Sequence, residues 1–179
     1  MFRRNPRNQC LPECWLFTDE KRGGDPCAAI RRLPRGSGVI FRHYADPRRE
    51  PLARRCARIA RQKGHVFLVA GDEKLARRVG ADGTHMPGFA RMARPFTAAA
   101  HNRTELIRAE RAGARLVFLS PVFATQSHPD GRAMGRTGFG RLARTAKVRV
   151  AALGGVTPHR YRSLKQWGAA GWGAISALS

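Results

Sequence analysis

The sequence predicts an α/β protein with the fold of a (β/α)₈ barrel, and three observations predict it. Short apolar runs alternate with helical patterns along nearly the whole chain, at the spacing of βα units. A Gly154-Gly155 turn opens a helix directly after an apolar strand at 148–153, and a second glycine-flanked apolar run follows at 171–178. Two consecutive strands whose carboxyl ends can hold one phosphate are typical of the last two strands of such a barrel.

The first half of the chain carries three strand–helix units. In the second of their helices, Leu52, Cys56 and Ile59 recur at helical spacing, with arginines off that stripe. Gly80 is expected to end the third helix. The six expected elements are the strands 14–19, 39–44 and 66–70 and the helices 25–33, 50–63 and 72–79.

The second half continues the alternation less evenly. Asn102 and Glu105 form a capping-box-like helix start. A loop rich in Gly, Pro, Ser and His covers 121–138, and loops of that length are often functional. The expected elements are the strands 82–86, 95–100, 116–120, 148–153 and 171–178 and the helices 88–93, 102–113, 138–146 and 157–168.

The sequence leaves no room for a helix after the last strand, so we expect a compact TIM barrel that lacks its eighth helix. The outer face of that strand, at Trp172 or Ile175, then needs cover from an N-terminal arm or from a partner subunit. We expect a basic irregular arm at 1–12, a single barrel domain at 13–179, and either a homodimer or a docked arm.

The charge composition of the chain indicates which kinds of partner it could bind. The formal charge of the 179 residues is +22, from 34 Lys and Arg against 12 Asp and Glu. Such a balance favours an anionic partner, either a phosphorylated small molecule or nucleic acid. The arginines are spread over the chain without a block of like charge, so we interpret the charge as a solvated, arginine-rich surface and expect no nucleic-acid partner. A basic RNA-associated protein is the alternative that rests on charge alone.

Cysteine usage and the N-terminus point to a cytoplasmic protein with free thiols. No apolar stretch follows the basic Met1–Arg7 segment, and no run of 18 apolar residues occurs, so we expect neither a secretory signal nor a membrane span. Cys10 and Cys14 could form half of a metal site, but no second Cys or His pair completes it.

A series of motifs, in order from about Leu16 to Leu178, resembles the thiamine phosphate synthase/TenI family. The resemblance implies a (β/α)₈ barrel of thiamine biosynthesis that joins a pyrimidine diphosphate to a thiazole phosphate and releases pyrophosphate, with Mg²⁺ as cofactor. The motifs are Leu16-Phe17-Thr18-Asp19, Phe41-Arg42, 80–85, Ala99-Ala100-His101, 113–125, Leu153-Gly154-Gly155-Val156 and 168–176.

The same resemblance implies roles for individual residues. Arg42 would contact the diphosphate. The thiazole phosphate would be held through hydroxyl and backbone donors, and the residues that match are Thr125, Gly154, Gly155 and Ser176.

The departures from the family pattern fall on the diphosphate and Mg²⁺ half of the site. The second-strand Lys becomes Tyr44, a third-strand Asn-Asp pair aligns with Ala70-Gly71, and a later Lys is His128. Asp72 lies one residue after Gly71 and could bind a metal only if its loop shifted. We expect no other metal ligand. The sequence therefore predicts a synthase-like protein that binds thiazole phosphate or thiamine phosphate, with full transferase activity in question.

A TenI-like isomerase, or a relative that binds a phosphorylated ligand without catalysis, is the alternative. In the isomerase the catalytic His would fall at Pro121, which is neither an acid nor a base. His101 and His128 are the proton-transfer candidates that we place with Arg42 in the catalytic set, because His titrates near neutral pH. His85 is a further candidate, and a structural hydrogen-bonding role is the alternative for each histidine.

Overall fold

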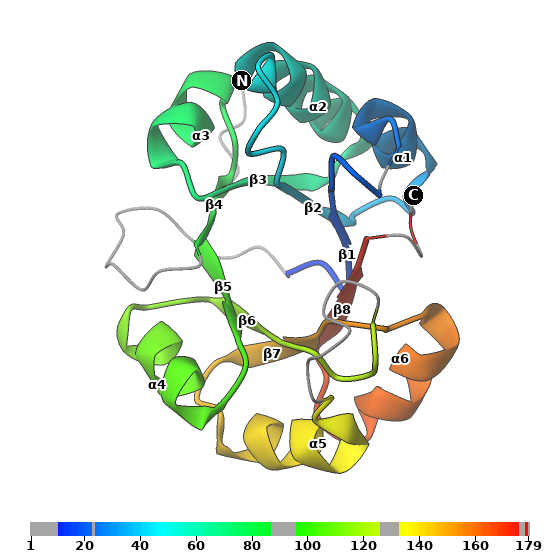
Figure 1. The fold of residues 1–179 in the computed structure, drawn as a ribbon, viewed down its shortest axis with the longest axis vertical. Coiled ribbons are helices and arrows are strands. Elements are labelled where there is room, and N and C mark those ends of the chain that lie inside the picture. Colours follow the sequence, from blue (N-terminus) through cyan, green and yellow to red (C-terminus); the bar gives the residue numbers. More distant parts are fainter. Residues whose placement is uncertain (1–10, 23, 87–95, 126–132, 176–177, 179) are drawn as a thin grey trace.

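The computed structural model describes residues 11–22, 24–86, 96–125, 133–175 and 178. Eight parallel strands pair in chain order, and β8 pairs with β1 to close the barrel (Figure 1). The barrel predicted from the sequence is confirmed. The strands are β1 (Cys14–Phe17), β2 (Gly38–Phe41), β3 (Val66–Ala70), β4 (Gly83–Met86), β5 (Phe96–Ala100), β6 (Leu116–Leu119), β7 (Arg149–Ala152) and β8 (Gly171–Ala174).

Six helices surround the barrel in the described parts of the chain. Figure 1 shows α1, α2 and α3 on one side of the strands and α4, α5 and α6 on the other. The helix expected at 88–93 lies outside the described residues. The helices are α1 (Pro26–Arg32), α2 (Arg49–Lys63), α3 (Glu73–Val79), α4 (Arg103–Arg111), α5 (Gly135–Thr145) and α6 (Pro158–Lys165).

Local sequence explains most helix ends. Asp72, Asn102 and Thr157 each cap a helix by accepting a backbone N–H from the third residue on. Gly64 and Gly80 end α2 and α3 with positive φ angles of 72° and 67°, a conformation that favours glycine.

Two boundaries differ from the sequence prediction. Helix α5 begins at Gly135 rather than at 138. Gly135 has a φ of +67°, a left-handed conformation that favours glycine, and its N–H donates to the Val122 carbonyl at 2.9 Å, so the chain turns into the helix there. Strand β8 ends at Ala174, where its last pair is with Leu16 of β1, and residues 176 and 177 of the expected strand 171–178 lie outside the described ranges.

Aromatic side chains fill the barrel interior. The Phe118 ring meets those of Trp15 and Phe17 edge to face, with centroids 5.6 and 4.9 Å apart. Glycine makes room for them, because a Cβ on Gly38 would lie 2.1 Å from the Trp15 ring and one on Gly173 would lie 2.6 Å from Phe17. The small barrel therefore has a packed core and no pore.

The outer face of β8 is covered within the chain. Trp172 is only 6% exposed and stacks on Tyr161 of α6, with centroids 6.1 Å apart. The Tyr161 hydroxyl donates to the Glu13 carboxylate at 2.8 Å, and Leu178 packs against the cores of both helix groups. Within the described residues α6 packs on Trp172, while the docked arm and the homodimer stay predictions, because the first ten residues lie outside the described ranges.

Among the residues that the structure describes, no helix combines the length and apolar character needed to cross a membrane.

Candidate functional site

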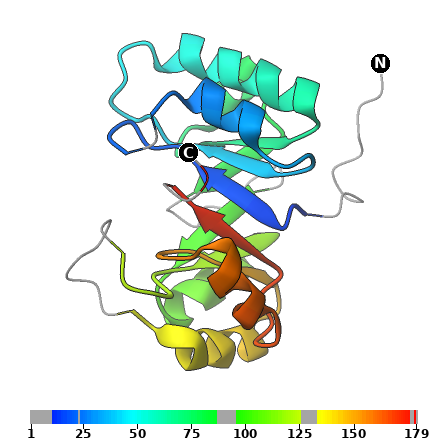
Figure 2. The ribbon, with the colours of Figure 1, turned by 90° about the vertical axis from the view of Figure 1, so that its right-hand side faces the viewer.

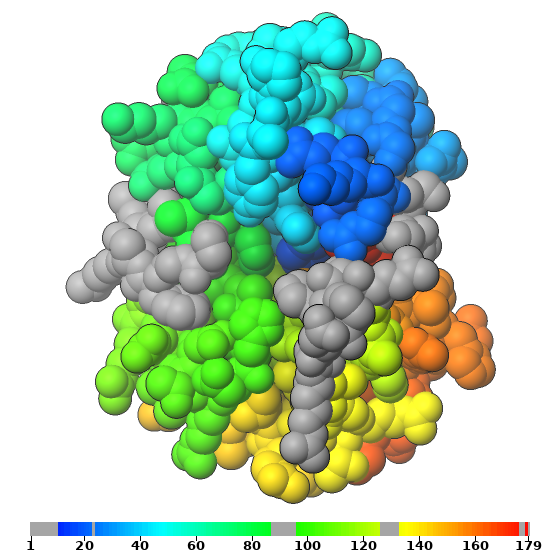
Figure 3. All heavy atoms as spheres, viewed as in Figure 1, coloured from blue at the N-terminus to red at the C-terminus, as the bar shows by residue number. Residues whose placement is uncertain are grey.

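The mouth at the carboxyl ends of the strands is the place where barrels of this kind carry their sites. Alternate strand residues face the interior, and the same alternation continues past the strand ends. Asp19 follows the interior residue Phe17 by two positions, and Arg42 likewise follows Ile40. Figure 2 shows β1 and β8 running in the same direction, and Figure 3 views the face on which they end.

Asp19 anchors the part of the mouth next to β1. Its carboxylate accepts the Lys21 and Arg22 backbone N–H groups at 3.0 and 3.1 Å, and the Arg22 and Arg42 guanidinium groups lie 2.9 and 3.7 Å from it. Burial opposes ionisation, but these hydrogen bonds and charges outweigh it and hold the pKa of Asp19 below its ordinary value. The negative charge of Asp19 is therefore already stabilised by backbone N–H groups and guanidinium groups of the protein itself.

Arg42 and His43 are fixed by Thr18. The Thr18 hydroxyl accepts the Arg42 backbone N–H at 3.0 Å and bonds Nδ1 of His43 at 3.0 Å. The His43 ring stacks on Phe41, with centroids 4.9 Å apart, and burial lowers its pKa against the opposing charges of nearby carboxylates. The sequence analysis placed Arg42 in the site, and the structure places it at the mouth.

Arg49 and Asp72 form an ion pair at the end of β3. Arg49 Nη1 lies 3.2 Å from Asp72 Oδ2, and Nη2 donates to the Ala70 carbonyl at 2.8 Å. The other Asp72 oxygen accepts the Leu75 N–H and caps α3. Both carboxylate oxygens of Asp72 are therefore occupied by protein donors.

The residues here do not fit the Mg²⁺ that the family implies. Mg²⁺ binds through carboxylate oxygens, and those of Asp72 face a cap and a guanidinium. Gly71 has a φ of +71°, and a Cβ there would meet Tyr44 at 3.4 Å, so an Asp at this position would be strained. No three His, Cys, Asp or Glu side chains of the described ranges gather where they could hold a metal ion.

His85 forms the floor of the mouth. Its ring is buried against Phe17 and Phe118, and Nδ1 bonds the Thr97 hydroxyl at 2.9 Å. Burial, together with the charge of Arg42, lowers the pKa of His85 to about 3. His85 is therefore neutral at physiological pH, and its geometry matches the structural alternative.

His101 stands beyond the end of β5. Its Nδ1 donates to the Ser120 carbonyl at 2.7 Å, because a carbonyl oxygen only accepts. Its backbone N–H donates to the Glu105 carboxylate at 2.8 Å. In the neutral ring, the lone pair then lies on Nε2, which can accept a proton. The backbone thus fixes one tautomer of a candidate base.

The loops after β6 and β7 are joined. The Val122 and Phe123 N–H groups donate to the Leu153 and Gly154 carbonyls at 2.9 and 3.0 Å. Gly154 and Gly155 have φ angles of +86° and +62°, and a Cβ on Gly155 would lie 2.5 Å from the Ala124 carbonyl. Close packing against the 121–124 loop therefore requires glycine here, in addition to any ligand.

Backbone donors remain at this turn. The N–H groups of Gly154, Gly155 and Val156 donate to no acceptor among the described residues. They precede α6, whose N-terminus favours an anion. Arg160 donates to the Gly155 carbonyl at 2.7 Å, and its guanidinium lies 4.9 Å from the centre of the Phe123 ring. The turn therefore combines unpaired donors with a nearby cation.

The Ala124 carbonyl, one residue before Thr125, lies against Gly155, while Arg42 and His101 directly follow β2 and β5. His128 and Ser176 lie outside the described residues. Sequence reasoning missed Asp19, Arg49 and Arg160. The strand alternation could have singled out Asp19, whereas the Arg49 contact depends on how α2 packs against β3.

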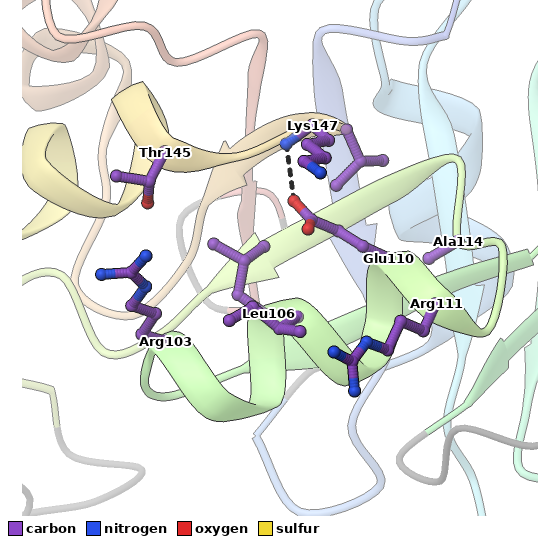
Figure 4. Close-up of a pocket in the computed structure, with 9 residues that line it drawn as sticks. Arg103, Leu106, Glu110, Arg111, Ala114, Thr145 and Lys147 are labelled. Carbon is purple, nitrogen blue, oxygen red and sulfur yellow. Dashed lines mark hydrogen bonds between the residues drawn. The ribbon is translucent and has the colours of Figure 1, made fainter.

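A groove of about 520 Å³ lies on the outside of the barrel, between α4 and the segment that joins α5 to β7 (Figure 4). Leu106, Ile107 and Val148 line it, and Glu110 accepts the Lys147 backbone N–H at 2.6 Å. Val148 precedes β7, so the groove lies toward the amino-terminal ends of the strands, where barrels carry stability rather than chemistry.

Fold and site together define a class: a parallel (β/α)₈ barrel with a glycine turn after its seventh strand whose backbone N–H groups donate to no acceptor among the described residues. The family model described as thiamine monophosphate synthase matches residues 16–178. The chain belongs to this family, and the resemblance found in the sequence is confirmed.

The similar proteins found by sequence and by structure support this family assignment. The chain is 30% identical to the thiamine-phosphate synthase of Bacillus velezensis, over 92% of this chain and 82% of that protein. It is 33% identical to the thiamine-phosphate synthase of Methanoregula boonei, over 93% and 85%. The thiamine phosphate pyrophosphorylase structure from Pyrococcus furiosus superposes with a TM-score of 0.76 at 23% identity and covers 97% of this chain and 89% of its own, which shows the shared fold.

Proposed function

We propose that the protein binds thiazole phosphate, or the product thiamine phosphate, at the barrel mouth as its part in thiamine biosynthesis. The observation that carries the proposal is the turn before α6, where the N–H groups of Gly154, Gly155 and Val156 have no acceptor among the described residues. Backbone donors that precede a helix N-terminus suit a phosphate. Thr125 and Ser176 add hydroxyl donors in this proposal, and Arg160 adds positive charge at the edge.

The reacting part of the ligand would then face Arg42 and His101. Arg42 directly follows β2 at this mouth, with its guanidinium 3.7 Å from the Asp19 carboxylate, so we assign it to the anionic leaving group of the second substrate. Displacement of a diphosphate builds negative charge on the leaving oxygen, and a fixed guanidinium stabilises that charge. Since the Asp72 carboxylate does not fit Mg²⁺, no step of this proposal passes through a metal ion.

One observation favours a second function. The hydrogen bond from His101 Nδ1 to the Ser120 carbonyl leaves Nε2 as the basic nitrogen. A base at the mouth can move a proton on a bound thiazole phosphate, which is the chemistry of the isomerase alternative. His128 shares this role in the proposal.

A product assay separates the two functions. The protein is incubated with the pyrimidine diphosphate and the thiazole phosphate, with Mg²⁺ or with EDTA, and thiamine phosphate is measured. A thermal shift with each ligand runs beside it, because a ligand that binds the native state raises its stability. We expect thiazole phosphate and thiamine phosphate to stabilise the protein. If neither does, the proposed function is wrong.

The oligomer and the compartment belong to the same proposal. We propose a cytoplasmic protein with a small phosphorylated substrate, and the homodimer stays a prediction. Its original reason is weakened, since Trp172 is covered by α6 within one chain. Light scattering of the full chain tests it, with a monomer mass contradicting the dimer.

A further inference from the structure

The part of the mouth next to β1–β3 holds more positive than negative charge. The ion pairs at these strand ends join three guanidinium groups, those of Arg22, Arg42 and Arg49, to the two carboxylates of Asp19 and Asp72. Lys21 and Glu20, in the loop after β1, add one charge of each sign. A surplus of cations attracts an anion and repels a divalent cation.

Arg49 is held rigidly in this cluster. It is the first residue of α2, and its guanidinium contacts the Ala70 carbonyl and the Asp72 carboxylate. Tyr44 lies over the guanidinium, with 5.5 Å between its ring centre and Cζ. The side chain is 20% exposed, so its charge is little screened by water. A positive charge is thus fixed between the loops that follow β2 and β3.

One donor of this guanidinium is unused. Nε of Arg49 is buried and has no hydrogen-bond partner among the residues that the structure describes. A buried donor without an acceptor is costly, whereas an acceptor from a ligand would remove that cost. Tyr44, the aromatic side chain that lies over this guanidinium, is 52% exposed, so this side of the arginine faces the surface.

We propose that the Arg49 guanidinium supplies the positive charge that a divalent cation would otherwise supply, so that a diphosphate-type anion binds beside β1–β3 without Mg²⁺. The inference rests on the proposed function, because it concerns the second anionic group at the same mouth. The diphosphate site of this chain would then be independent of metal, whereas the sequence pattern of the family implies a site that depends on Mg²⁺.

Inorganic pyrophosphate is the probe. Its binding to the full chain is measured by calorimetry in EDTA and again in excess Mg²⁺. We expect binding in EDTA, because the protein carries its own cations. A free-metal control accounts for the Mg²⁺–pyrophosphate complex that forms in solution. Pyrophosphate binding that needs Mg²⁺, or that is absent in both buffers, would overturn the proposal.

Two matched variants of α2 locate the site. Arg49→Met should weaken pyrophosphate binding by about tenfold or more, the loss expected when a charge-assisted hydrogen bond is removed. Arg54→Met, which removes an exposed arginine paired with Glu50 on the same helix, should leave it unchanged. Equal affinity of Arg49→Met and the wild type would contradict the assignment.

A third variant and a second ligand complete the design. If Arg49→Met does not fold, Arg49→Lys keeps the charge but loses the Nε donor and should bind more weakly than the wild type. Titration of thiazole phosphate into the same samples tests the proposed function separately. In the wild type, thiazole phosphate binding without pyrophosphate binding would sink only the present inference, and pyrophosphate binding without thiazole phosphate binding would sink only the proposed function.

Discussion

The mouth of this barrel has two unlike sides. Beside β1–β3, charged side chains meet one another, as when Arg49 meets Asp72 and Arg22 meets Asp19. Beside β6 and β7 the available groups are backbone N–H donors at Gly154 and Gly155. The first side is fixed by ion pairs and the second by the close approach of two loops. A change of side chains beside β1–β3 can therefore leave the backbone donors after β7 in place.

The largest expected effect concerns His85, which lies beneath both sides. It is neutral in the folded protein, where its pKa is about 3 against an ordinary 6.5, and protonated in the unfolded chain below pH 6.5. The unfolded state therefore binds the extra proton, and stability is lost as pH falls from 6.5 toward 3. Each such group contributes about 1.4 kcal/mol per pH unit, or roughly 3 kcal/mol between pH 6.5 and 4.5.

Urea unfolding at several pH values measures this dependence. His85→Gln should flatten the slope, while His159→Asn, on the exposed surface of α6, should leave it as in the wild type. An unchanged slope in His85→Gln would show that other groups govern acid unfolding, for example His43 and His65, whose pKa values are also lowered by burial.

The backbone side is tested by Gly155→Ala. The new Cβ would lie 2.5 Å from the Ala124 carbonyl at a φ of +62°, so the two loops must separate. We expect thiazole phosphate binding to fall by about tenfold or more, as the donors lose their alignment. Gly113→Ala is the matched control, because its φ is +85° but nothing lies within 4 Å of the added Cβ. Equal binding by both variants would contradict a role for the turn.

The ion-paired side is tested by two helix caps. Asp72→Ala and Asn102→Ala each remove a cap and should each cost about 1 kcal/mol of stability. Asp72→Ala also leaves Arg49 without its carboxylate, so it should cost about 1 kcal/mol more. Chemical denaturation measures the difference, and equal costs would mean that the pair adds nothing to the fold.

The smallest expected effect on binding concerns His101. His101→Gln should leave thiazole phosphate affinity within about twofold of the wild type, because such a small ratio is well under 1 kcal/mol. Any isomerase turnover should be lost, since Gln cannot accept the proton. Turnover that persists in this variant would remove His101 from the catalytic set.

Much of this could be predicted from the sequence. The eight strands follow from short apolar runs in the sequence. The helix ends follow from local signals, such as the capping residue Asn102 and the terminating residue Gly80. The reason for glycine at 155 could not be predicted, because it depends on packing against Ala124, some thirty residues earlier in the chain. The Arg49–Asp72 pair was missed for the same reason: only the packing of α2 against β3 brings the two together.

The premature end of β8 and the early start of α5 have a similar cause. A prediction from the sequence extends a helix or strand as far as its residue composition allows. In the structure, the element's limits depend on the neighbouring residues with which its backbone forms hydrogen bonds. Tertiary hydrogen bonds, such as that from Gly135 to Val122, decide such limits. The roles of Arg42, Thr125, Gly154, His128 and Ser176 stay predictions.

The central claim is that the turn before α6 binds the phosphate of a thiazole phosphate. Amide NMR of the full chain, titrated with that ligand, tests it most directly, because each donor N–H reports on its own hydrogen bond. We predict that the amide signals of Gly154, Gly155 and Val156 shift together and saturate, while those of Leu106 and Val148 in the outer groove stay in place. Saturating binding that leaves the three turn amides unmoved, or no binding at all, would contradict the account.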